Sequence, residues 1–320
     1  MAKPRLVIIG SPSRQKKDRP LVEEAEKEFQ VEYVPITQAR LGLARSMTLM
    51  YDGKSVSKSD RVLLIPTITH KEMFYTIARM LGDRCMPFNH KQYLLTLNED
   101  VMFKYLERFG IPTRESIFIC ASSSLPAGLK KIRFPATVRM GAKRVKVTDA
   151  ETLKDVVGLA GRGTPVEIET PVPTEKTIWT FVVGEEVVAG YEKSKNDVKS
   201  TSVDDEIKRL AVSVRSALGC DYCALKFIAD KRGKTILDKI TFCPDFGNFQ
   251  KITSKNVASY IVGHLKRRLE EEKVEWWVPK PILDVMKKLQ VPRSEMARIE
   301  RGRIKKARSE SMRRREKSSR

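Results

Sequence analysis

The segment TILDKITFCPDFGNFQKIT, residues 235–253, decides how the rest of the chain is interpreted. A β-branched run leads into a Cys-Pro turn, and a glycine follows where a helix should begin. Strand ends of this kind are places where enzymes hold metal-binding carboxylates. This strand carries Asp238 beside Lys239 and Ile240, one acid next to a cation and a hydrocarbon. The segment therefore indicates either a working site or one whose ligands have been replaced.

The composition indicates a large, basic globular protein. The chain has 320 residues, more than one compact core usually holds, so we expect two or three domains. Its net charge is +21, from 61 Lys and Arg against 40 Asp and Glu. This excess favours an anionic partner such as nucleic acid over a charge-rich protein with no such partner.

Cysteine usage and hydrophobic runs bear on the compartment. The five cysteines are odd in number and scattered, and the N-terminus lacks a secretory signal pattern, so we expect reduced thiols and a cytoplasmic protein. No apolar run approaches the roughly 18–20 residues of a membrane span, so no membrane partner is expected. The pair Cys220 and Cys223 forms a CxxC motif without a second pair, which favours small core residues over a zinc or redox site.

Strands and helices alternate near the N-terminus. Residues 5–10, 31–36 and 61–69 are predicted strands, and residues 20–29 and 70–81 are predicted helices. This order indicates a Rossmann-like α/β domain with a parallel sheet over residues 1–90. The first strand is followed by GSPS, so the glycine fingerprint of dinucleotide-binding proteins is absent.

Residues 91–273 are richer in strands. A helix over residues 98–112 is predicted to place Val101, Met102, Tyr105, Leu106 and Phe109 on one face. Residues 177–184 and 186–194 are predicted to form a β-hairpin, and residues 205–219 a helix ended by glycine. Two further strands and a helix over residues 254–272 close this α+β region.

The C-terminus, residues 274–320, is predicted to be a helical latch followed by a basic tail. Residues 293–320 contain 12 Lys and Arg against 4 Glu, a net charge of +8, with few apolar anchors. Such a segment cannot bury enough surface to fold alone, so we expect a frayed helix or a disordered arm that an anionic partner orders. The candidate anion-binding residues are Arg303, Lys305, Lys306, Arg308, Arg313, Arg314, Arg315 and Lys317.

The ordered set of elements resembles the RimK-like ATP-grasp proteins, which are carboxylate–amine ligases. The resemblance runs over residues 4–269 and is carried by the helix ending FGIP, the strand FPATVRM, the segment VEIET, the hairpin TIWTFVVGEEVVAGYEKS, the helix ending ALGCDY and the strand ILDKITF. It implies an ATP-grasp fold with a pre-ATP-grasp domain, two α+β lobes and a basic helical extension. It also implies a site where ATP and a carboxylate form an acyl phosphate, which needs cations and Mg²⁺ around the phosphates.

Several positions that the resemblance assigns to ATP have changed here. A phosphate-binding lysine falls at Glu99, and a second falls at Arg139, where the charge is kept but the geometry differs. The flap over the phosphates is reduced to four residues that include Lys143. Lys143 is either a phosphate contact or a solvated cation.

The remaining assigned positions are mixed. Glu169 matches the acid that holds adenine, and Trp179 replaces an arginine. Lys193 is either a phosphate contact or a solvated strand end.

The metal positions depart most from the resemblance. The first ligand falls at Lys226, the second at Asp238 and the third at Ile240. Because Mg²⁺ takes at least one or two carboxylates, Asp238 is a weak candidate ligand and Mg²⁺ is not expected. We predict instead that Lys226 and Asp238 form an ion pair, with the ammonium in the metal's place.

Two functions fit these observations. The first is a degenerate ATP-grasp protein that acts as a basic module for RNA or a ribonucleoprotein. The second is an active, divergent ligase that joins an amino acid such as glutamate to a protein or cofactor. In the second case ATP is a cofactor, bound by Arg139, Lys143, Glu169, Lys193, Lys226 and Asp238. The sequence indicates no oligomeric state.

Overall fold

The structure is a computed structural model, and it describes residues 3–43, 47–56, 61–67, 70–87, 90–96, 99–119, 124–125, 129–130, 132–140, 143–160, 166–170, 172, 174, 176–195, 197–229 and 233–275. The chain divides into two compact units, Met1–Ile261 and Val262–Arg320. Of the second unit, residues 262–275 are described, as part of helix α9 (Val257–Glu275). The predicted domain boundaries at residues 90 and 273 stay predictions, and the basic tail lies outside the described residues. No helix in the described part of the chain is long and apolar enough to cross a membrane.

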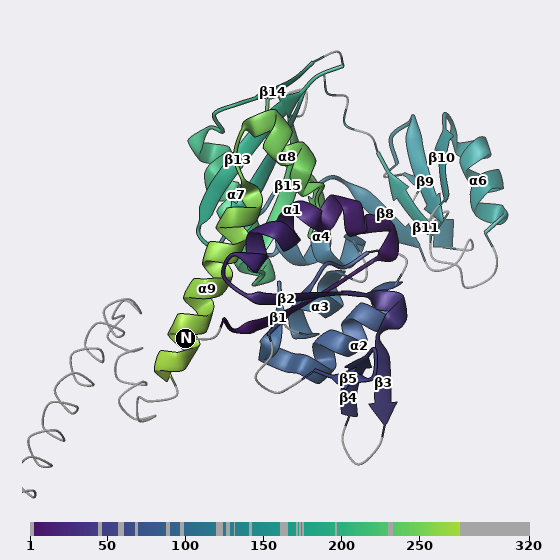
Figure 1. The fold of residues 1–320 in the computed structure, drawn as a ribbon. Coiled ribbons are helices and arrows are strands. Elements are labelled where there is room, and N and C mark those ends of the chain that lie inside the picture. The colour runs from purple at the N-terminus through teal and green to yellow at the C-terminus, as the bar shows by residue number, and fades with distance from the viewer. Residues whose placement is uncertain are drawn as a thin grey trace, which may run out of the picture. The chain divides into compact units, whose positions relative to one another are not determined.

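The first sheet is parallel, as the alternation of strands and helices predicts (Figure 1). Its strand order is β2-β1-β6-β7, and β1 is buried from Leu6 onward because it lies in the sheet interior. The elements are β1 (Arg5–Gly10), β2 (Gln30–Pro35), β6 (Arg61–Leu64), β7 (Cys85–Met86), α1 (Gln15–Glu26), α2 (Lys71–Leu81) and α3 (His90–Thr96), with short 3₁₀ turns at Pro12–Arg14, Ile36–Gln38 and Gly82–Arg84.

A small antiparallel sheet was not expected from the sequence. It consists of β3 (Arg40–Leu43), β4 (Met47–Tyr51) and β5 (Lys54–Ser55). Asp52 and Gly53 join β4 to β5 with φ values of 46° and 70°. An Asp-Gly pair with two positive φ values is typical of a tight hairpin turn, so this local signal was present in the sequence.

The second sheet has the order β10-β9-β11-β8 and is antiparallel along the pairs that the structure records. Helix α6 covers one face, where Leu153 and Val157 pack with strand residues that include Val138. Asp149 caps α6 by accepting a hydrogen bond from the Thr152 amide. The elements are α4 (Glu99–Glu107), β8 (Ser116–Ile119), β9 (Ala136–Met140), β10 (Lys143–Val147), α6 (Ala150–Gly158) and β11 (Val166–Glu169).

The predicted apolar face of α4 is partly wrong. Met102 and Leu106 are buried as expected, together with Phe103. Val101 and Phe109 are 52% and 56% exposed, because the buried stripe follows positions 102, 103 and 106. The helical period alone did not decide which of two adjacent apolar stripes faces the core.

The third sheet has the order β14-β13-β12-β15-β16, with antiparallel neighbours. The predicted hairpin is confirmed, with β12 and β13 joined at Gly184, whose φ is 56°. The predicted helix end at Gly219 is also confirmed, since this residue takes a left-handed conformation. The elements are β12 (Thr177–Val183), β13 (Glu186–Lys193), β14 (Val198–Ser200), α7 (Asp205–Leu218), β15 (Tyr222–Ala229), β16 (Thr235–Thr241) and α8 (Phe246–Thr253).

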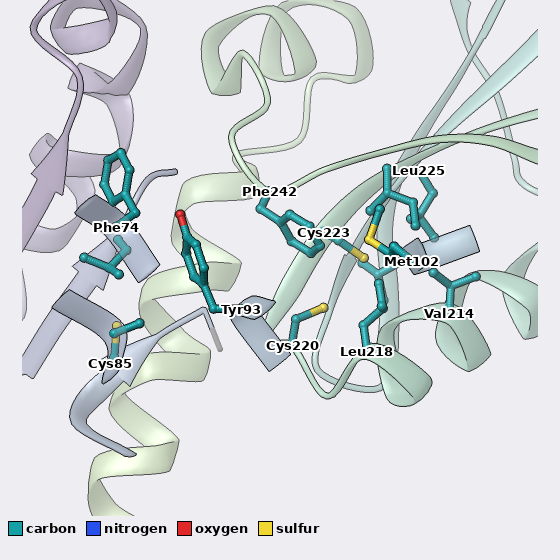
Figure 2. Close-up of a cluster of buried hydrophobic side chains, with 14 of the residues drawn as sticks. Phe74, Cys85, Tyr93, Met102, Val214, Leu218, Cys220, Cys223, Leu225 and Phe242 are labelled. Atoms are coloured by element: carbon teal, nitrogen blue, oxygen red, sulfur yellow. The ribbon is translucent and has the colours of Figure 1, made fainter. Parts of the chain in front are cut away.

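Cys220 and Cys223 are core residues, as the sequence favours. Both are buried with free thiols, and Figure 2 shows them among Met102, Leu218 and Phe242. Burial raises the pKa of the Cys220 thiol, so the thiolate needed for metal or redox chemistry is disfavoured.

Candidate nucleotide-binding site

Arg139 stands at the centre of an ion-pair cluster on one face of the second sheet. It lies on β9 directly opposite Glu167 on β11, so the two side chains share a face. Its Nη1 atom donates to Glu99 Oε2 at 2.8 Å, and Nη2 pairs with Glu167. The predicted phosphate-binding cation is therefore already held by two carboxylates.

Arg114 is a second cation of this cluster, and the sequence analysis did not identify it. Its side chain is 8% exposed, and its guanidinium lies 4.9 Å from the centre of the Phe103 ring. Arg114 Nη2 lies 2.9 Å from Glu169 Oε1, 3.3 Å from Glu167 Oε1 and 3.6 Å from Glu99 Oε2. Buried carboxylates are stabilised by nearby cations, and Arg114 supplies one here. No local sequence signal identifies Arg114, because its three acid partners lie on separate elements.

Backbone pairing brings Arg114 to the third sheet. Thr113 forms a bridge with Leu237 of β16, and the Leu237 amide donates to the Pro112 carbonyl at 2.9 Å. Arg114 Nη1 then donates to the Asp238 carbonyl at 3.4 Å. The arginine cluster and the strand that opened the sequence analysis are thus neighbours.

Lys226 and Asp238 form the ion pair that the sequence predicts. The Nζ atom of Lys226 lies 2.8 Å from Asp238 Oδ2, and the side chains are 27% and 23% exposed. In the strand register Lys226 faces Lys239, and Phe227 faces Leu237, so Asp238 is the extra residue of a bulge on β16. This bulge explains how Asp238 can reach Lys226, because regular alternation would place it on the other face.

The donor set does not fit a magnesium ion. Asp238 is held by an ammonium group, and Ile240 at the third ligand position is 7% exposed in the core and offers no oxygen. No group of three His, Cys, Asp or Glu side chains placed to hold a metal occurs within the described ranges. Mg²⁺ needs oxygen ligands in near-octahedral geometry, which these residues do not supply.

The ion-paired groups of the site offer no positive excess to a polyphosphate. The cluster of Glu99, Arg114, Arg139, Glu167 and Glu169 carries three negative and two positive charges, and the Lys226–Asp238 pair adds none. The exposed cations on the same face, Arg144 and Lys146, lie on β10, outside this cluster.

Among the described residues, the others that the resemblance assigns to the site have no recorded contact with the Arg139 cluster. Trp179 faces Lys226 across β12 and β15 and stacks on Tyr191, with ring centres 6.2 Å apart. Lys193 is exposed at the end of β13. Strand pairing puts Arg144, rather than Lys143, on the face of Arg139. The eight predicted tail cations lie outside the described residues.

Comparisons with known proteins agree with this fold. No protein-family model matches the chain. An alpha-aminoadipate–LysW ligase, LysX, from Sulfolobus acidocaldarius is 21% identical over 188 residues, covering 52% of this chain and 68% of that protein. A RimK domain ATP-grasp protein from Sphaerobacter thermophilus has a TM-score of 0.66 at 15% identity, covering 81% of this chain and 98% of that one. A RiPP-associated ATP-grasp ligase from Chryseobacterium gregarium, in complex with ADP and a leader and core peptide, has a TM-score of 0.64 at 12% identity, covering 83% and 97%. The predicted ATP-grasp fold and the resemblance to RimK-like proteins are confirmed.

Proposed function

We propose, from the premise that this chain has the ATP-grasp fold, that it is a basic binding module for RNA or a ribonucleoprotein without Mg²⁺-dependent ligase activity. The observation that carries the proposal is that two predicted phosphate-binding cations of the site are already paired with acids. Arg139 is paired with Glu99, and Lys226 with Asp238, each at 2.8 Å. Groups that would contact phosphates or metal in a ligase are engaged with each other.

Exposed cations that belong to no recorded ion pair among the described residues support an anionic partner. Strand β10 carries Lys143, Arg144 and Lys146, all exposed, and no ion pair is recorded for them within the described ranges. The tail adds 12 cations against 4 acids. Clustered cations neutralise phosphates without reading sequence, so we expect RNA binding with little sequence preference.

The alternative is an active ATP-dependent ligase that joins an amine to a carboxylate. It is favoured by the fold and by a structural neighbour, the ATP-grasp ligase PsnB, which is described in complex with a precursor, Mg and ADP. In this chain it requires Arg139 and Lys226 to leave their acid partners and to replace metal ions by direct contacts with phosphate.

Calorimetric titration of ATP into the full chain, with and without MgCl₂, separates the two functions. We expect no micromolar binding in either buffer, because Arg139 and Lys226 are held by acids and the described residues at the metal positions do not fit Mg²⁺. Micromolar ATP binding that requires Mg²⁺ would rule out the proposal and support the ligase.

RNA binding is tested by filter retention of a 20-nucleotide oligouridine over a range of salt concentrations. If six to eight cations engage, the slope of log K against log salt should be about −4 to −6. Replacing the eight candidate tail cations with glutamine should abolish most of the retention. A tail of the same composition in scrambled order is the matched control and should retain it. Equal retention by the glutamine variant would contradict the assignment of RNA binding to the tail.

A further inference from the structure

The two edge strands of the second sheet differ in chemistry. Strand β10 has three cations among its five residues, whereas β8, with the sequence SIFI, has no charged residue. Exposed edge strands present unpaired backbone groups that recruit other strands, and proteins commonly protect them with charged side chains, especially lysine. By this criterion β10 is protected and β8 is not.

The outer side of β8 is accessible. Within the described ranges, its recorded backbone pairing is with β11, residue by residue from Ser116 opposite Glu169 to Ile119 opposite Val166. A groove of about 810 Å³ is lined by all four β8 residues, with Ile132 among its other apolar walls. Phe118 is 42% exposed, so a large aromatic side chain stands at this edge.

The groove is positively charged. Its charged lining residues are Lys104, Lys130, Arg133 and Glu115. Lys104 is paired with Glu107 at 2.9 Å. Lys130 and Arg133 are exposed, and the described part of the chain shows no ion pair for either. Two cations are therefore available to a ligand that occupies this edge.

We infer that β8 docks an extended acidic peptide, which adds a strand to the sheet and sets apolar side chains against Phe118. Strand addition supplies affinity through main-chain hydrogen bonds and specificity through alternate side chains. Lys130 and Arg133 would pair with the acidic residues of that peptide.

Charge and shape favour this occupant over the others. A second copy of this chain would bring the same cations to the edge, and the chain's own tail carries a net charge of +8. Both would be repelled. RNA matches the charge but has no amide groups to pair with a strand edge. The inference is independent of the proposed RNA function, because it concerns different residues.

The probe is a fluorescein-labelled, eight-residue peptide of alternating Glu and Val, titrated with the full chain and followed by fluorescence anisotropy. We expect saturable binding. A peptide with Lys in place of Glu should not bind. Two further peptides carry N-methyl groups on the odd-numbered or on the even-numbered amides, and one of these two should not bind, because its methyl groups block the hydrogen bonds to β8. The inference would be overturned if the Glu peptide did not bind, if the Lys peptide bound equally well, or if both N-methylated peptides bound as well as the unmethylated one.

Variants localise the binding site. Lys130→Glu combined with Arg133→Glu should weaken binding by about tenfold or more, because two attractive charge pairs become repulsive. The matched control, Lys143→Glu with Lys146→Glu on β10, should change it by less than threefold. Phe118→Ser is a second, single-site variant and should also weaken binding, because it removes the apolar contact without adding charge. Equal effects of the two double variants would overturn the inference. So would displacement of the peptide by oligouridine, or a dimer in light scattering that Phe118→Ser dissociates.

Discussion

Arg114→Met tests whether the buried cluster depends on Arg114 as its geometry indicates. Methionine keeps an apolar chain of similar length against Phe103 but removes the charge. Glu169, 13% exposed, loses the cation at 2.9 Å, whereas Glu167, 3% exposed, keeps Arg139. Removing one partner of a buried pair costs about 3–5 kcal/mol. Because Arg139 remains, we expect the lower end, a loss of about 3 kcal/mol in the free energy of unfolding.

Thermal unfolding followed by circular dichroism is the appropriate assay. For a folding unit of this size, about 3 kcal/mol corresponds to a fall in Tm of roughly 6–12 °C. Arg133→Met is the matched control, since Arg133 is exposed and should change the free energy by less than about 0.5 kcal/mol. Combining Arg114→Met with Glu169→Gln should recover part of the loss, because the uncompensated carboxylate is gone. Equal shifts for Arg114→Met and Arg133→Met would refute the reasoning.

Three further predictions concern other buried contacts. Gly10→Ala should lower Tm by several degrees in thermal unfolding, since a Cβ atom would lie 2.3 Å from the Tyr33 hydroxyl oxygen and 3.1 Å from Asp18 Oδ2; an unchanged Tm would contradict the close approach. Burial raises the pKa of Asp18 above its ordinary value of 3.8, so the native chain binds the extra proton and stability should fall as pH rises above about 4. Asp18→Asn should remove that part of the pH dependence in urea titrations, and identical profiles for the two proteins would exclude it. Lys226→Met should cost about 1.5 kcal/mol in the same titrations, because Asp238 loses a charge-assisted hydrogen bond at 2.8 Å; adding Asp238→Asn should restore most of it, and an unchanged loss would show that the pair is not the cause.

Features coded by local signals could be predicted from the sequence. Gly184 between two β-branched runs indicated the β12–β13 hairpin, and Gly219 after a helical period indicated the end of α7, because glycine at positive φ costs little. The parallel first sheet followed from the alternation of strands and helices. The Lys226–Asp238 pair was predictable because the resemblance placed both residues on paired strands at the metal positions.

The rest depends on tertiary contacts that have no local signature. Arg114 meets Glu99, Glu167 and Glu169 only after separate strands and a helix have assembled, so its partners are set by topology. The bulge at Asp238 is likewise a property of the pairing between β15 and β16. Periodicity could not decide between adjacent stripes of α4, because the choice depends on what packs against the helix.

The ion pairs allow an estimate of how much weaker ATP binding should be in this chain than in a site whose cations are free. To bind Mg²⁺ and a triphosphate at this site, the chain must open the Arg139–Glu99 and Lys226–Asp238 pairs, whose members are 19–27% exposed. A hydrogen bond to a charged group contributes about 1.5–3 kcal/mol, so opening both costs roughly 3–6 kcal/mol. At about 1.4 kcal/mol for each factor of ten, ATP affinity falls by roughly 10²–10⁴, which turns a micromolar site into one with a Kd of about 0.1–10 mM. Binding of RNA through exposed cations carries no such cost, because those side chains have no acid partner to leave among the described residues. The ion pairs that would weaken nucleotide binding at the site therefore leave the exposed cations of β10 unaffected.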